Sequence, residues 1–109
     1  MSNYSRGEVV LVRYPFSDLS GSKVRPAVVI STAHSSQDVL ILPLTSRTTS
    51  LREGEFILVD WKQAGLNVET ATKRGIYTVD QNLVTQSLGN LSDQDLEGLS
   101  NSLRQWLDL

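Results

Sequence analysis

The sequence contains no cysteine and only one histidine, His34, among its 109 residues. The chain therefore has no disulfide framework, no thiolate metal ligand and no cysteine nucleophile, and one histidine excludes a multi-histidine metal cluster. Long apolar runs are also absent, since none approaches the roughly 18 residues of a membrane span. The first residues lack the apolar segment and cleavage site of a signal peptide. We expect a cytoplasmic protein without a membrane segment, metal or cofactor.

The composition is that of a small globular protein. Hydrophobic residues make up 39% of the chain and charged residues 20%, which differs from the polar, highly charged profile of disordered chains. A chain of this length has room for one compact core. We expect a single domain over residues 1–109.

The formal net charge of −2 is unevenly distributed. Residues 1–79 hold nine basic and seven acidic side chains, a balance of +2, whereas residues 80–109 hold one basic and five acidic ones, a balance of −4. A polyanion, if one binds, should meet the first part of the chain. The same charged residues are also typical of an ordinary solvated surface, so the charge distribution alone does not indicate a function.

Short segments rich in β-branched and aromatic residues predict a mainly β protein. No helix of ten residues separates these segments, which favours a small, strongly bent, mostly antiparallel sheet or partly open barrel of five to seven strands over a parallel α/β sheet. Strands are expected over residues 8–14, 24–31, 38–44, 55–60 and 75–79, with a brief sixth over 83–85 and a surface loop over 17–23.

Only the C-terminal segment has a helical pattern. Its apolar residues recur at i, i+3, i+7 and i+10 and line one face, namely Leu96, Leu99, Leu103 and Trp106. Ser92 is the expected N-cap, and Asp93 and Asp95 place negative charge where a helix N-terminus favours it. The sequence therefore predicts a C-terminal helix that starts after Ser92.

The residues available for chemistry are hydroxyls, carboxylates and arginines. His34 stands in a polar stretch typical of an exposed loop, and no nucleophile-elbow or phosphate-binding glycine motif is present. Arg25 follows the predicted loop, and Thr45 and Ser46 end the third predicted strand. A guanidinium and neighbouring hydroxyls can hold a phosphodiester, although the same residues also suit a solvated strand end and turn.

Four stretches of the sequence stand in the order found in a known family. They are Arg6-Gly-Glu-Val-Val-Leu-Val, Tyr14-Pro-Phe, Gly21-Ser-Lys-Val-Arg-Pro-Ala-Val-Val-Ile-Ser31 and Leu42-Pro-Leu-Thr-Ser46. Together they closely resemble the MazF/PemK family of toxins from type II toxin–antitoxin systems. Tyr77-Thr-Val-Asp80 and Leu88-Gly-Asn-Leu-Ser92 are similar to the family's second half, so the resemblance covers nearly the whole chain.

The resemblance implies an SH3-like barrel with a C-terminal helix, usually a homodimer. It also implies an mRNA interferase that arrests growth: a metal-independent, sequence-specific endoribonuclease acting on single-stranded RNA. A cognate antitoxin would neutralise it, and DNA would be bound only through that antitoxin. The family's catalytic positions carry over to Arg25 and Thr45, with Ser46 beside them. The implied chemistry is attack of the ribose 2′-OH on its own phosphate, which leaves a 2′,3′-cyclic phosphate and a 5′-OH.

Two departures from the family pattern concern the general base. The loop before Arg25 lacks the histidine that some members carry, and Asp18 is the nearest ionisable substitute. Arg74 stands where many members have an acidic residue, whereas another register gives that role to Asp80. The base therefore stays open between Asp18, Asp80 and neither.

Further residues are candidates for substrate binding. Lys23, Arg47 and Arg74 can add positive charge, and Tyr14, Phe16 and Tyr77 can stack on RNA bases. The alternative is that the cations are ordinary surface residues and the aromatics belong to the core.

Two other functions stay open. The same barrel is used by toxins that inhibit DNA gyrase without catalysis, and the acidic, tryptophan-containing C-terminal helix suits a protein partner. A further hypothesis is a catalytically silent member that only binds RNA or a partner. It is motivated by the missing loop histidine and by Arg74 at the position where many members have an acidic residue. The RNA sequence that is cut depends on loop contacts and is not predicted.

Overall fold

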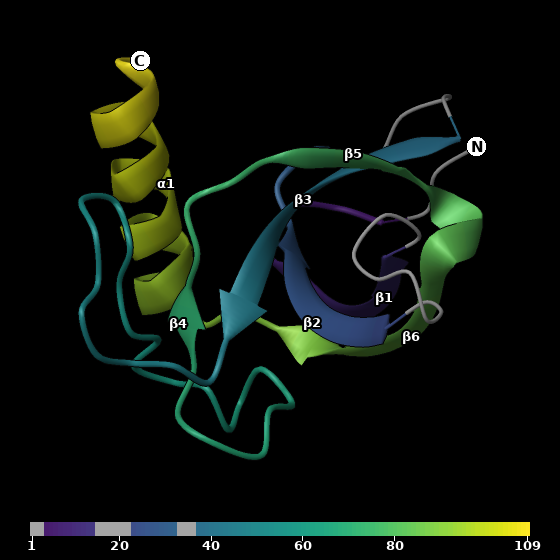
Figure 1. Ribbon diagram of the computed structural model, residues 1–109, viewed down its shortest axis with the longest axis horizontal. Coiled ribbons are helices and arrows are strands. Elements are labelled where there is room, and N and C mark those ends of the chain that lie inside the picture. Colours follow the sequence, from purple (N-terminus) through teal and green to yellow (C-terminus); the bar gives the residue numbers. More distant parts are fainter. Residues whose placement is uncertain (1–3, 15–22, 33–36) are drawn as a thin grey trace.

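The computed structural model describes residues 4–14, 23–32 and 37–109. The elements in chain order are β1 (Glu8–Tyr14), β2 (Lys23–Val29), β3 (Asp38–Thr45), β4 (Ala71–Thr72), β5 (Tyr77–Asp80), the 3-10 helix η1 (Gln81–Leu83), β6 (Val84–Asn90) and α1 (Asp93–Leu107). The strands form one antiparallel sheet in the order β4-β3-β2-β1-β6, with β5 also paired to β3. Figure 1 shows this sheet curled on itself with α1 at one side. The predicted class, a strongly bent mainly β sheet with a C-terminal helix, is confirmed.

Strand β3 bends the sheet because it changes partners along its length. Its residues Asp38–Ile41 pair with β5, and its last two residues pair with β4, while β2 lies along its other edge. The pairing of β1 with β6 contains two register shifts, which increase the local twist. These features curl the sheet around its interior, and the residue after β3, Ser46, is exposed.

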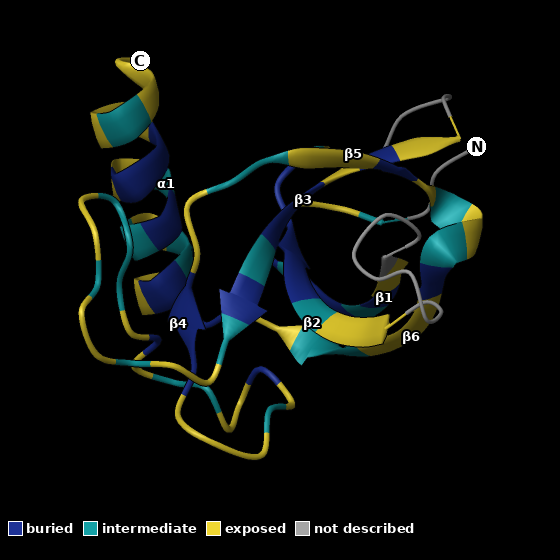
Figure 2. Ribbon diagram, in the orientation of Figure 1, coloured by how far each residue is buried: buried dark blue, intermediate teal, exposed yellow. Residues whose placement is uncertain are grey.

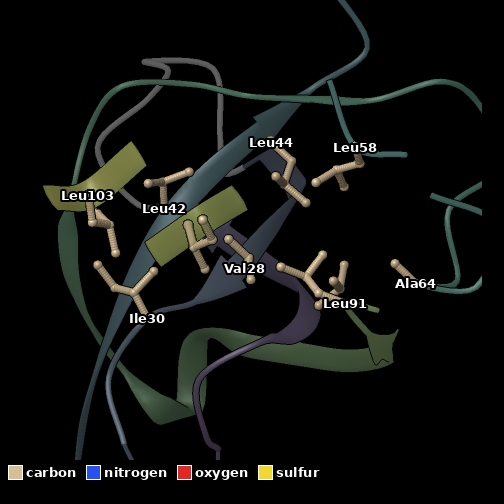
Figure 3. Close-up of a cluster of buried hydrophobic side chains, with 10 residues drawn as sticks. Val28, Ile30, Leu42, Leu44, Leu58, Ala64, Leu91 and Leu103 are labelled. Atoms are coloured by element: carbon tan, nitrogen blue, oxygen red, sulfur yellow. The ribbon is translucent and has the colours of Figure 1, made fainter. Parts of the chain in front are cut away.

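Side chains on both faces of the central strands are buried. Alternate residues of β1, β2 and β3 enter two separate clusters, because successive side chains of a strand point to opposite faces. The first cluster contains Val28, Leu42 and Leu44 and is covered by Leu58 and by Leu103 of α1 (Figure 3). The second is built from Val10, Val12, Ala27, Val29, Val39, Ile41, Val79 and Val84. Burial on both faces explains the continuous apolar runs within these strands, over residues 9–12, 26–29 and 39–44.

Helix α1 begins as the sequence predicts. The hydroxyl of Ser92 accepts a hydrogen bond from the backbone N–H of Asp95 at 3.2 Å, so Ser92 is the N-cap. The helix turns Leu99 and Leu103 towards the sheet, and Figure 2 shows its buried residues on that side. None of the helices in the described part of the chain is both long and apolar enough to span a membrane.

The prediction of a strand over residues 55–60 is wrong. Only Ile57 forms a bridge, to Ala71. The backbone N–H groups of Val59 and Asp60 each donate to the buried carboxylate of Asp95 at 2.9 Å, so they are not available to a neighbouring strand. The segment is therefore fastened to the start of α1. The two-residue strand β4 was not predicted, and the predicted loop over 17–23 lies, except for Lys23, outside the described residues.

Candidate active site

An open groove of about 720 Å³ lies beside the ends of β2 and β3. Besides β2 and β3, its lining includes residues 65–68 of the long β3–β4 connection, the segment that follows β4, and single residues of β1, β5 and β6. The polar and aromatic side chains that line it include Arg25, Thr45, Ser46, Lys73 and Tyr77. All three predicted catalytic residues therefore share one groove.

The register of the sheet explains why Arg25 and Thr45 meet there. Ala27 of β2 pairs with Pro43 of β3 in an antiparallel ladder. Counting two residues outwards along both strands brings Arg25 opposite Thr45, and residues directly opposite each other share one face of a sheet. The strands thus place a guanidinium and a hydroxyl on the same face of the sheet, and both residues line the groove.

The hydroxyl of Thr45 is held by the backbone two residues further along the chain. Its Oγ1 accepts a hydrogen bond from the N–H of Arg47 at 3.1 Å. A hydroxyl has one proton to donate and two lone pairs, so this contact occupies a lone pair and leaves the proton available. Thr45 is half-buried at the end of β3, where it also pairs with Ala71 of β4. The groove therefore contains a hydroxyl donor, that of Thr45, whose oxygen is held in place by the N–H of Arg47.

Two of the residues that the structure describes, Arg25 and Lys73, bring cationic side chains to the groove. Arg25 and Lys73 are exposed, and neither forms an ion pair with any residue that the structure describes. The backbone N–H of Lys73 donates to the carbonyl oxygen of Pro43 at 2.9 Å, which holds the lysine against the end of β3. Lys73 was missed in the sequence, because β4 has only two residues and shows no periodicity that would locate the residue after it.

The rest of the lining is largely apolar. Leu11, Pro26, Pro43, Leu44 and Leu88 contribute to it. Tyr77, at the start of β5, is 40% exposed. Apolar lining residues, an exposed aromatic ring and two cations together suit a ligand that has both a flat ring and an anionic group.

The remaining predicted cations lie elsewhere. Arg47 lines a smaller hollow beside the groove. The guanidinium of Arg74 lies 5.4 Å from the ring centroid of Trp106. Lys23 is the exposed first residue of β2 and pairs with Tyr14. The structure thus brings none of these three cations into the lining of the groove.

Several predicted residues fall where the structure gives no description. Phe16, Asp18 and His34 lie outside the described residues, and Tyr14 ends β1 with a side chain that is not described. Asp80 is described: it pairs with Asp38 at the opposite end of β3 from Thr45, and its carboxylate accepts the N–H of Asn82 at 2.8 Å. The structure therefore separates Asp80 from the groove.

Glu55 is a buried carboxylate that sequence reasoning did not single out. Burial raises its pKa, but hydrogen bonds from the backbone N–H groups of Arg52 at 2.7 Å and Arg74 at 2.9 Å lower it, as does the Arg52 guanidinium at 3.6 Å. The net effect is a pKa below the ordinary value of 4.5. The ionised carboxylate ties the turn at residues 52–55 to the segment that carries Lys73. The sequence around Glu55 gives no signal for this role, because both hydrogen-bond donors are backbone N–H groups, which every residue except proline has.

Residues 5–107 match the family described as PemK-like, MazF-like toxin of type II toxin–antitoxin system. The chain has 18% identity to a MazE–MazF structure from Deinococcus radiodurans (TM-score 0.78, covering 99% of each chain). It has 16% identity to an endoribonuclease in complex with its cognate antitoxin from Mycobacterial species (TM-score 0.77, covering 97% of this chain and 96% of that one). It has 18% identity to the Mycobacterium tuberculosis toxin MazF-mt6 (TM-score 0.75, covering 94% and 97%). Comparison with curated proteins finds no match.

Proposed function

Because this chain belongs to the PemK-like, MazF-like family of type II toxins, we propose that it is a sequence-specific endoribonuclease that cleaves single-stranded RNA. The observation that supports this most strongly is the shared groove of Arg25 and Thr45, in which the threonine oxygen is held by the N–H of Arg47. The proposal assigns the activity to one toxin domain over residues 1–109.

In the proposed reaction the ribose 2′-OH attacks the adjacent phosphorus. A bond forms between the 2′ oxygen and phosphorus while the bond from phosphorus to the 5′ oxygen breaks. The 2′ oxygen gives its proton to a general base or to solvent, and the departing 5′ oxygen takes a proton from solvent, so the protons balance. The products are a 2′,3′-cyclic phosphate and a 5′-OH, and no water is consumed in this step.

The groove supplies what this transition state needs most, which is stabilisation of charge. The phosphorane carries more negative charge on its oxygens than the ground state does. Arg25 offers planar, permanently charged donors to those oxygens, and Thr45 and Ser46 offer hydroxyl protons. Lys73 adds a second positive charge from the same lining. We therefore propose Arg25, Thr45 and Ser46 as catalytic residues and Lys73 as an additional contact.

The lining of the groove suits a single strand with unstacked bases. The exposed ring of Tyr77 offers a stacking surface, and stacking on aromatic residues is a common way to hold unpaired bases. Substrate contacts from Lys23, Arg47, Arg74, Tyr14 and Phe16 stay predictions, as does a homodimer.

A cognate antitoxin is the proposed protein partner. An antitoxin that covers the groove would block access to Arg25, and an acidic segment would complement the groove's two cations. Addition of the antitoxin should then protect RNA from the toxin in proportion to the complex formed.

The products of the reaction give the experiment that tests this function. Purified protein is incubated with a long, weakly structured RNA in the presence of EDTA, and the 5′ ends and terminal phosphates are analysed. We expect discrete cuts with 5′-OH and 2′,3′-cyclic phosphate ends. Intact RNA together with inhibition of DNA gyrase would support the non-enzymatic toxin, and tight RNA binding without cuts would support a silent member.

A further inference from the structure

A second, smaller hollow of about 340 Å³ lies beside the groove. Thr45 and Lys73 line both cavities, so the two are contiguous. The other residues of the hollow come from the turn-rich segment after β3, which is rich in hydroxyls, and are Arg47, Thr49, Ser50, Leu51, Arg52 and Glu55. A cavity of this size is at the small end of ligand sites, which run from about 300 Å³ upwards.

Positive charge is in excess in this hollow, although the chain as a whole has a net charge of −2. Among the described residues that line it, three are cations, Arg47, Arg52 and Lys73, and one is a carboxylate, Glu55. The Glu55 side chain is only 8% exposed and is bound by Arg52 and by two backbone N–H groups. Arg47 and Lys73 have no ion pair within the described part of the chain. The hollow therefore presents two uncompensated cations to whatever enters it.

The donors of the hollow match the oxygens of a phosphodiester. Ammonium and guanidinium groups bind phosphate oxygens strongly, and serine and threonine hydroxyls can add neutral hydrogen bonds. A nucleobase has little apolar surface to contact there, because Leu51 is the one large apolar side chain among the described residues of the lining. The chemistry points to the backbone of a nucleic acid rather than to its bases.

We propose that this hollow is a second phosphate subsite, which holds the phosphodiester next to the one that is cleaved. Arg47 binds that neighbouring phosphate, and Lys73 stands between the two phosphates and contacts both. The inference rests on the proposed RNA cleavage and extends it from one phosphate to two. It makes Arg47 a positioning residue, whose loss weakens binding of longer RNA.

The roles of Arg47 and Lys73 predict different kinetic signatures. Arg47→Gln should raise KM about tenfold on a long RNA while kcat changes little, as expected for loss of one charge-assisted contact. Lys73→Gln should both raise KM and lower kcat, because it removes a contact to the reacting phosphate as well. Arg104→Gln, on the exposed side of α1, is the matched control and should behave like the wild type.

The test compares two RNAs that contain the same mapped cut site. One is long, and the other is truncated so that no phosphate reaches the hollow. Wild-type protein should cleave the long RNA with the higher kcat/KM, and Arg47→Gln should reduce this advantage about tenfold. A general loss of structure would lower kcat/KM equally for both RNAs and leave their ratio unchanged.

Salt dependence provides a second readout. Binding of the long RNA with a 2′-deoxyribose at the cut position is followed by fluorescence anisotropy at several salt concentrations. Arg47→Gln should make the slope of log K against log salt shallower by about 0.7, the value for one phosphate contact to a single strand. An unchanged ratio and an unchanged slope, with cleavage by the wild type intact, overturn the subsite and leave the proposed function standing. A wild type that does not cleave RNA overturns both.

Discussion

The backbone N–H of Arg47 donates a hydrogen bond to Oγ1 of Thr45 at 3.1 Å. The contact spans only two residues, so it is made by the local turn at the end of β3 and does not depend on distant packing. It fixes the position of the hydroxyl oxygen and leaves the proton available for a ligand. Thr45 lines both the groove and the neighbouring hollow, so this hydrogen bond lies where the two cavities meet.

Thr45→Val tests the hydroxyl. Valine keeps the branched shape that suits the end of a strand but has no proton to donate. Removal of one preorganised donor to a developing oxyanion costs roughly 100-fold in rate or more. We expect single-turnover cleavage of RNA to fall by about that factor, with little change in the melting temperature. Thr45→Ser should retain most of the activity, and a Thr45→Val protein that cuts as fast as the wild type would remove Thr45 from the reaction.

Asp95 is predicted to be the most important carboxylate for stability. It is buried, and its two oxygens accept the N–H groups of Val59 and Asp60 at 2.9 Å. Asp95→Ala leaves two donors without an acceptor, so the free energy of unfolding should fall by about 2–4 kcal/mol. Urea unfolding measures this loss. The control Asp93→Ala, an exposed residue of the same helical turn, should cost less than about 1 kcal/mol.

Glu55 predicts a pH dependence of stability. Its pKa is lower in the folded protein than its ordinary value of 4.5, so the ionised form is favoured by folding. The contribution of Glu55 is therefore fully present above about pH 4.5 and is lost as the pH falls through the lower, folded pKa. The difference in unfolding free energy between wild type and Glu55→Gln should be constant from pH 6 to 8 and should shrink in acid, by roughly 1.4 kcal/mol for each unit of pKa shift. A difference that grows below pH 4.5 would contradict this assignment.

The elements that sequence analysis predicted well are those whose burial pattern is local. β1, β2 and β3 contain continuous apolar runs because both faces of those runs are covered, and the buried residues of α1 recur at helical spacing. The segment over residues 55–60 looks equally apolar but is not a strand. Its N–H groups are bound by Asp95, which lies 35 or more residues away in the chain. No local pattern carries that information.

The candidate site likewise contains residues that the sequence predicts and a residue that it does not. Chemistry and a family resemblance predict Arg25, Thr45 and Ser46 from the sequence, and the structure places all three in the lining of one groove. Lys73 was overlooked because it follows a two-residue strand. Arg74, its neighbour, was chosen instead, and its guanidinium stacks on Trp106. Adjacent residues of an irregular segment can face different surroundings, and sequence alone does not separate them.

Removal of the Arg25 guanidinium tests the central claim most directly. Cleavage of a long RNA by Arg25→Ala is compared with that by wild type and by Arg104→Ala, with the fold of each protein checked by circular dichroism. We predict that Arg25→Ala loses cleavage by at least 100-fold while it stays folded, and that Arg104→Ala cuts as the wild type does. A folded Arg25→Ala protein that cleaves RNA at the wild-type rate would contradict the account.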